Sequence, residues 1–193
     1  MTPQQQADKL NLFIGNFDNL IADTFESATL NLLSDIKTRV FGEHEDTSGG
    51  KLGQYSTKPT LIGAKSFINK GGANTFFEAQ KKKEDGKWRT VKGKHLFVLD
   101  GGYKELRQIQ GRQTAEIDLQ YSFELAKSGL TTKIGSGVYQ VKFANLLSQN
   151  KGRGFEKRRG KKVFYASNEE QKKAMSFVGK KIVGELKKAF GNV

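Results

Sequence analysis

Residues 18–41 read DNLIADTFESATLNLLSDIKTRVF, and this stretch decides the fold class of the chain. Its apolar side chains recur at steps of three and four, so they form one stripe along a helix. The stripe comprises Leu20, Ile21, Phe25, Ala28, Leu32, Leu33, Ile36 and Val40. Asp18 is suited to cap the start, Lys37 and Arg39 place cations in the last turn, and Gly42 is suited to stop the helix. We therefore predict a long amphipathic helix over about 18–41.

A second long helix is predicted near the other end of the sequence. Ser167 and Glu170 have the Ser-x-x-Glu spacing of a capping box, in which two orphan amides at a helix start are satisfied. An amphipathic pattern follows over 168–190, and its lysine pairs recur at intervals of seven and eight residues, so they fall on one basic face. A short helix is also expected at 101–110, where Gly111 ends the pattern.

A small antiparallel sheet is predicted between the two long helices, within residues 114–167. Residues 114–123 alternate apolar and polar side chains, which is the pattern of a half-buried strand. This alternation puts Glu116 and Asp118 on the polar face of the strand. The segment 138–144 predicts a further strand or a helix-like crossing over the sheet. Other short strands are expected at 88–91, 130–134 and 163–167, and residues 95–99 are expected to form either a short strand or a buried approach to a turn.

Three Gly-rich segments are expected to be extended loops: 42–63, 68–75 and 151–162. The first contains the run Glu43-His44-Glu45-Asp46, whose spacing fits no standard calcium or zinc site. We interpret that run as a solvated turn after the helix. The organisation predicted is one domain over 1–193, with a helix at 18–41, a loop-rich middle at 42–113, a sheet at 114–167 and a helix at 168–190.

The third Gly-rich segment, KGRGFEKRRGKK at 151–162, is the strongest functional feature of the sequence. It holds seven basic residues and one acidic residue, and its three glycines argue against a stable helix. Mobile basic side chains gain from counterion release on DNA or RNA, and they are equally suited to an acidic protein surface. Its single aromatic residue, Phe155, gives little support for base stacking. The candidate contacts are Lys151, Arg153, Lys157, Arg158, Arg159, Lys161 and Lys162.

The composition of the 193 residues excludes several classes of protein. Without cysteine there is no disulfide scaffold, thiolate zinc site or cysteine nucleophile. No apolar run approaches the roughly 18 residues that a membrane helix needs, so we expect no membrane partner. Neither histidine, His44 or His95, has the context of a catalytic triad, and the pair Glu116 and Asp118 is more simply a solvated strand face. We expect no enzyme, no catalytic residue, no metal and no cofactor.

The net charge of +13 is distributed unevenly along the chain. Residues 1–50 hold 3 basic and 8 acidic side chains, residues 51–150 hold 17 and 8, and residues 151–193 hold 13 and 4. The three segments therefore carry −5, +9 and +9. Two interpretations stay open: the acidic and basic ends pair within one monomer, or the acidic face of one copy meets the basic face of the next.

The order of these pieces resembles the tailed-phage virion morphogenesis and tail-completion proteins, which act at the head–tail junction. The family pattern R-x-F…D-x-x-G…Y-S is matched where the first helix runs into its loop. A later pattern, G-x-x-Y-…-F/H-…-N/Q-x-G, is matched up to the basic segment, with one extra residue here between its glycine and its tyrosine. The matching residues are Arg39, Phe41, Asp46, Gly49, Tyr55, Ser56, Gly135, Tyr139, Phe143, Asn150 and Gly152. Residues 98–103 read VLDGGY where the family has a leucine–threonine–glycine–x–leucine segment.

The resemblance implies an α+β fold in which the N-terminal and C-terminal helices pack a small antiparallel sheet. It also implies a homo-oligomeric ring of this chain in the virion, assembled in the host cytoplasm. The ring would stack between portal, adaptor or tail proteins, with double-stranded DNA in its lumen. The alternative is a stand-alone basic protein that binds nucleic acid without sequence specificity.

Overall fold

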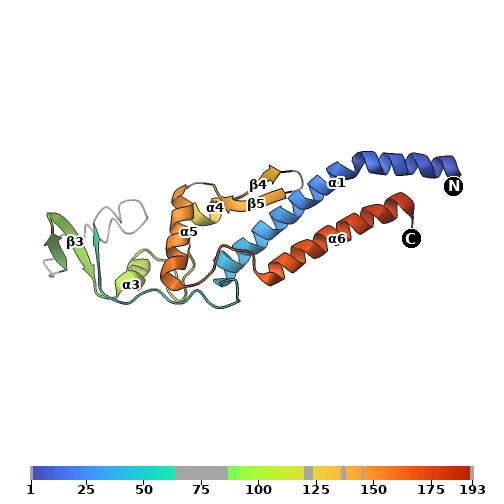
Figure 1. Cartoon of the computed structure of the whole chain (residues 1–193). Coiled ribbons are helices and arrows are strands. Elements are labelled where there is room, and N and C mark those ends of the chain that lie inside the picture. Colours follow the sequence, from blue (N-terminus) through green and yellow to red (C-terminus); the bar gives the residue numbers. More distant parts are fainter. Residues whose placement is uncertain (1, 64–86, 120–123, 136–137, 145, 192–193) are drawn as a thin grey trace. The chain divides into compact units, whose positions relative to one another are not determined.

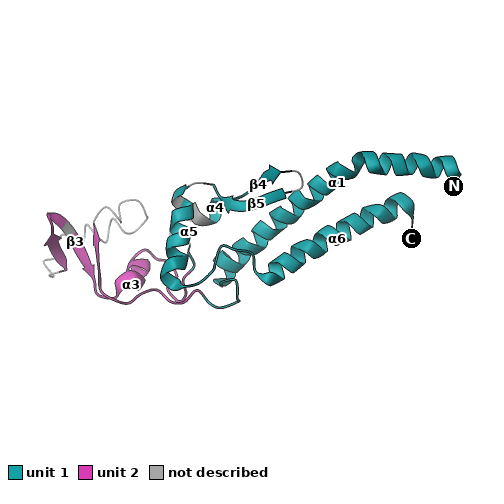
Figure 2. Ribbon diagram, in the orientation of Figure 1, with its two compact units in different colours: residues 1–51, 118–193 teal, residues 52–117 magenta. Residues whose placement is uncertain are grey.

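The computed structural model describes residues 2–63, 87–119, 124–135, 138–144 and 146–191 (Figure 1). The chain groups into two compact units: residues 1–51 with 118–193 form unit 1, and residues 52–117 form unit 2 (Figure 2). The fold class is α+β, as predicted, with long N-terminal and C-terminal helices and small antiparallel sheets. That the two units fold together as one domain stays a prediction.

Helix α1 spans Pro3–Lys37 and so starts well before the predicted position at Asp18. Its cap is Thr2 rather than Asp18. The Thr2 hydroxyl accepts a hydrogen bond from the Gln5 amide at 3.3 Å, and the Gln5 side chain accepts one from the Thr2 amide at 2.9 Å. This capping box, followed by a proline that needs no amide partner, accounts for the earlier start.

The end of α1 also differs from the prediction, because the helix does not stop at Gly42. It continues as a π-helical turn, η1, over Thr38–Glu43, which ends at His44 in the left-handed region at φ 59°. A π-helical turn widens the helix locally and changes which side chains face inward. Here both Arg39 and Val40 are buried.

Helix α6 spans Asn168–Phe190, and its predicted capping box is confirmed. It runs antiparallel to α1, as two contacts at opposite ends of the pair establish. The rings of Phe13 and Phe190 lie 5.4 Å apart, and Lys173 forms an ion pair with Asp35 at 3.1 Å. The acidic first helix and the basic last helix therefore do pair within the monomer.

A β-hairpin of β4, Gly129–Gly135, and β5, Val138–Phe143, packs against α1. It confirms the strand predicted at 130–134 and resolves the alternatives for 138–144 in favour of a strand. The Tyr139 hydroxyl donates a hydrogen bond to the Ala22 carbonyl of α1 at 3.0 Å. The short helix α4, Glu124–Lys127, precedes this hairpin.

Two predicted strands are wrong in the part of the chain that the structure describes. Residues 114–119 form no strand, and Ile117 and Asp118 are both buried although they are adjacent, so the alternation in this sequence is not a sheet pattern. Residues 163–167 form an irregular connection instead of a strand. Its first two amides, of Val163 and Phe164, donate to one carboxylate oxygen of Glu156 at 2.8 and 3.0 Å, so no strand partner is needed.

The loop predicted at 151–162 is largely wrong, because helix α5 spans Leu146–Arg159. Packing outweighs the poor helix propensity of glycine here. Gly152 is buried, and a Cβ at this position would lie 3.2 Å from the rings of Phe143 and Phe164. Only a residue without a side chain lets α5 approach these rings so closely.

Unit 2 is built on a three-stranded antiparallel sheet with the order β1-β3-β2. The strands are β1, Thr60–Gly63, β2, Trp88–Val91, and β3, Lys94–Leu99. Phe97 and Leu99 of the central strand are fully buried, and the Trp88 ring packs edge-on against Phe97 at 5.3 Å. Strand β1 occupies the last part of the predicted loop 42–63, so the loop is shorter than expected.

Helix α3, Gly102–Ile109, confirms the short helix predicted at 101–110. Gly102 is at φ 65°, and a Cβ there would overlap the Lys58 carbonyl. On the same helix the buried Arg107 guanidinium lies 4.7 Å from the centre of the Tyr55 ring. The Tyr55 ring in turn packs on Tyr103 at 5.6 Å.

Candidate interaction surfaces

The seven basic residues predicted as contacts do not form one uniform surface. Five of them lie on α5 and are exposed, namely Lys151, Arg153, Lys157, Arg158 and Arg159. Lys161 instead points into unit 1, where its ammonium donates to Asp46 at 3.0 Å and to the Lys51 carbonyl at 2.6 Å. Lys162 is exposed, and its carbonyl accepts from the Thr47 amide at 2.9 Å. The Lys161 side chain therefore serves contacts within unit 1 rather than contacts with a partner.

Lys157, Arg158 and Arg159 occupy the last turn of α5. Cations are favoured at that end of a helix, where the carbonyl dipoles point outward. The helix end is therefore a fixed cluster of positive charge rather than a mobile basic loop. Such a cluster can contact phosphates or an acidic protein surface.

A buried arginine joins three separated parts of unit 1. The Arg39 side chain donates to the Glu170 carboxylate at 2.8 Å and to the carbonyls of Glu45, Val163 and Tyr165 at 2.8–3.1 Å. Glu170 accepts from the Ser167 amide at the same time, at 2.7 Å. One ion pair thus connects the end of α1, the connection after α5 and the start of α6. Nothing local in the sequence indicated this pairing across 131 residues.

Asp46 organises the turn that follows η1, and it is buried rather than solvated as predicted. One of its carboxylate oxygens accepts from the Ser48 amide and hydroxyl and from the Gly50 amide at 2.6–3.0 Å, and the other accepts from Lys161. Burial raises the pKa of Asp46, but these hydrogen bonds together outweigh it and hold the pKa far below its ordinary value. The carboxylate therefore stays ionised in the folded protein.

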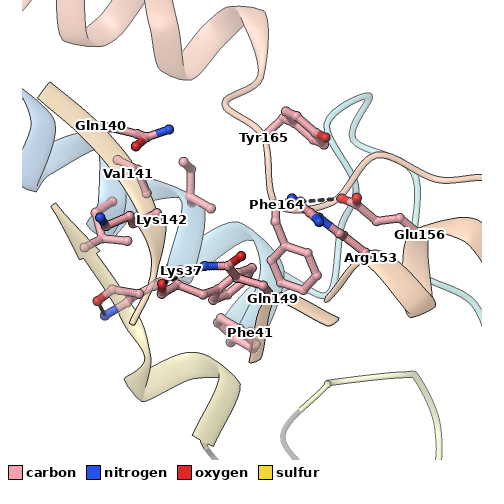
Figure 3. Close-up of a pocket in the computed structure, with 14 residues that line it drawn as sticks. Lys37, Phe41, Gln140, Val141, Lys142, Gln149, Arg153, Glu156, Phe164 and Tyr165 are labelled. Carbon is pink, nitrogen blue, oxygen red and sulfur yellow. Dashed lines mark hydrogen bonds between the residues drawn. The ribbon is translucent and has the colours of Figure 1, made fainter. Parts of the chain in front are cut away.

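A pocket of about 350 Å³ lies in unit 1 between α1, the hairpin, α5 and the connection that follows (Figure 3). Its aromatic floor is a packed cluster, because the Phe164 ring lies 5.0 Å from Phe143 and 6.4 Å from Phe41. The remaining lining residues are Leu33, Ile36, Lys37, Gly129, Gln140, Val141, Lys142, Gln149, Arg153, Glu156 and Tyr165.

Three cations border this pocket. Lys142 of β5 and Arg153 of α5 lie on opposite sides of it, and Lys37 comes from α1 (Figure 3). Within the described residues Lys142 and Arg153 have no hydrogen bond or ion pair, whereas Lys37 donates to the Gly129 carbonyl at 3.5 Å. Among the described lining residues Glu156 alone is acidic, and its carboxylate accepts from two backbone amides. The three cations therefore leave the lining positively charged, and the pocket suits an apolar group that carries a negative charge. Sequence reasoning found Arg153 but missed the other members, which only the fold brings together.

The two helices also present an uncovered apolar surface where the start of α1 meets the end of α6. Leu10, Ile14 and Phe17 are 46%, 61% and 37% exposed, and their spacing of four and three residues puts them on one side of α1. Val183, Leu186 and Phe190 are similarly exposed on α6. We call Leu10, Ile14 and Phe17 the α1 stripe.

Three other kinds of feature were considered in the sequence: the paired carboxylates, metal ligands and membrane helices. Glu116 and Asp118 are not side by side on a strand face, because Asp118 is buried and no strand forms there. Among the described residues, no three His, Asp or Glu side chains gather as metal ligands would. None of the described helices is both long enough and apolar enough to cross a bilayer.

Comparison with known proteins adds no relative to this picture. No protein-family model, curated protein or solved structure matches the chain. The function is therefore argued from the residues and from their arrangement.

Proposed function

We propose that this chain is a structural virion protein of the head–tail connector of a tailed phage. It assembles as a neck or tail-completion ring around the DNA exit channel, and it has no enzymatic activity. Its partners are further copies of itself and the portal, adaptor or tail proteins above and below the ring. The resemblance of the sequence to tail-completion proteins supports this location in the particle.

The observation that carries the proposal is the uncovered α1 stripe. Further along α1, Ala28 and Ile36 are buried by the rest of unit 1. A row of large apolar side chains left in water on the same helix costs free energy unless another surface covers it. The neighbouring subunits of a closed assembly provide such a surface, whereas in a monomer the stripe stays exposed to water.

The test is the assembly state of the full chain and its place in the particle. We expect sedimentation and electron microscopy of the purified protein to give closed rings, and mass spectrometry of purified particles to detect the chain. A protein that is monomeric at every concentration and absent from particles would contradict the proposal.

The exposed cations at the end of α5 favour a second candidate, a stand-alone protein that binds nucleic acid without reading its sequence. It predicts an affinity for DNA that falls steeply with salt. Neutralising Lys157, Arg158 and Arg159 together would then reduce the log–log salt slope by about 2.7, which is roughly 0.9 for each lost phosphate contact. No retention on DNA at low salt would rule this candidate out.

A further inference from the structure

We propose that the pocket between α1, the hairpin and α5 receives the α1 stripe of a second copy of this chain, with Asp18 beside its cations. This inference rests on the proposed function and names the contact that builds the ring. It joins two different surfaces, one on each copy.

The two surfaces are complementary in both polarity and charge. The pocket offers the rings of Phe41, Phe143 and Phe164 beneath the cations Lys142 and Arg153. The stripe offers large exposed apolar side chains, and Asp18 lies one turn after Ile14 on the exposed surface of α1. Helices that dock into grooves use anchors at this spacing of three and four residues.

Charge selects a second copy as the occupant of the pocket. Next to the stripe, the exposed Asp18 carries a negative charge, whereas Lys142 and Arg153 at the pocket carry positive charges. Opposite charges favour the pairing of stripe with pocket and disfavour stripe on stripe. A nucleic acid would contact the cations, but its charged phosphates would not pack against the aromatic floor.

The contact must form between molecules, because the stripe cannot reach the pocket of its own chain. Asp18 and Leu33, a lining residue of the pocket, lie on the same helix, α1. At 1.5 Å per residue the 15 positions between them span roughly 22 Å. The pocket and the stripe are different surfaces of the same chain, so their contact is a heterologous interface. Repetition of such an interface closes into a ring or grows as an open filament.

The pocket volume agrees with side chains as ligands. About 350 Å³ is near the lower end of the range for small-molecule sites. It accommodates one or two anchoring side chains rather than an extended ligand.

The experiment uses two variants of the full chain that damage opposite halves of the contact. The pocket variant is Lys142→Glu with Arg153→Glu, and the stripe variant is Ile14→Lys with Asp18→Lys. All four positions are exposed, so circular dichroism should show folded proteins. We expect the wild type to assemble and each variant alone to sediment as a monomer.

Mixing the two variants is the decisive measurement. The mixture contains one intact pocket and one intact stripe, so we expect one-to-one dimers that grow no further. If both variants still form rings, this contact is wrong although the ring function stands. If the mixture gives dimers but the wild type forms open filaments, the contact stands and the ring function fails. A wild type that stays monomeric overturns both, whereas variants that remain monomeric when mixed, beside a wild type that forms rings, overturn the contact alone.

Discussion

The two ends of the α1–α6 pair differ sharply. At one end, the last turns of α1 meet the start of α6. Two pairs of charged side chains form short hydrogen bonds there within unit 1, Arg39 with Glu170 and Lys161 with Asp46. At the other end, where the first turns of α1 meet the last turns of α6, the rings of Phe13 and Phe190 pack together. We call these the joined end and the open end.

The two ends therefore use different residue types for different purposes. Charged groups at the joined end are buried and paired, and they connect segments that are distant in sequence. Apolar groups at the open end are exposed, and they are available to another molecule. The joined end should therefore determine stability, and the open end should determine assembly.

The largest effect is expected for Arg39→Ala. Removing one partner of a buried ion pair leaves the other charge uncompensated, which costs about 3–5 kcal/mol. Arg39 and Glu170 side chains are only 9% and 10% exposed, so water cannot replace the lost contacts fully. Urea denaturation should show this loss as a large fall in the unfolding midpoint, because small domains have little stability to spare.

The control for this prediction is Arg158→Ala, which removes an exposed arginine from the last turn of α5. We expect its unfolding free energy to stay within about 0.5 kcal/mol of the wild type. Equal effects of the two substitutions would contradict the idea that the joined end holds the fold.

A smaller effect is expected for Asp46→Asn, about 1–3 kcal/mol near neutral pH, because several hydrogen bonds to a charged acceptor are weakened. The pKa of Asp46 is lowered by folding, so its ionised form adds stability above the unfolded-state pKa of about 3.9. That stability is lost as the pH falls below this value toward the folded-state pKa. Denaturation at several pH values should therefore show wild type and variant converging in acid.

Asp23→Asn, which alters an exposed carboxylate of α1, is the control for the Asp46 substitution. Its unfolding free energy should stay within about 0.5 kcal/mol of the wild type. A stability difference between Asp46→Asn and wild type that stays constant down to pH 2 would show that ionisation of Asp46 is not responsible.

The fold was predictable where local signals and packing agree. The Ser167–Glu170 capping box set the start of α6, and the strand predicted at 130–134 is β4. Prediction failed where packing overrides local preference. Gly152 argues against a helix by propensity, yet it lets α5 approach two aromatic rings. The alternation in 114–119 is not used by any strand.

The interaction surfaces were predictable only in part. The density of basic residues pointed to α5 and to Arg153, which does border the pocket. The aromatic floor and Lys142 come from segments that are far apart in sequence, so no spacing rule connects them. The internal contact of Lys161 with Asp46 could not be predicted either, because the adjacent residue, Lys162, is also a lysine and yet is exposed.

A third comparison concerns two glycines in α5. Gly152→Ala would press a methyl group against the rings of Phe143 and Phe164, whereas Gly154→Ala meets nothing within 4 Å. Alanine favours a helix over glycine by about 1 kcal/mol at either site, so the difference between the two variants isolates the steric cost. We expect Gly154→Ala to be more stable than Gly152→Ala by about 1–3 kcal/mol, the usual cost of overpacking. Equal melting temperatures would mean that the rings move aside freely.

The smallest effect on stability is expected at the open end, for Ile14→Gln. Ile14 is 61% exposed, so the folded monomer gains little from its burial, and its unfolding free energy should stay within about 0.5 kcal/mol of the wild type. The measurement is made on dilute protein, because assembly would add stability to the wild type alone. If Ile14→Gln lowers the stability of the monomer as much as a core substitution does, the open end belongs to the folding core. The stripe would then be needed for folding rather than available to another molecule, and the proposed division between a stabilising joined end and an assembling open end would be wrong.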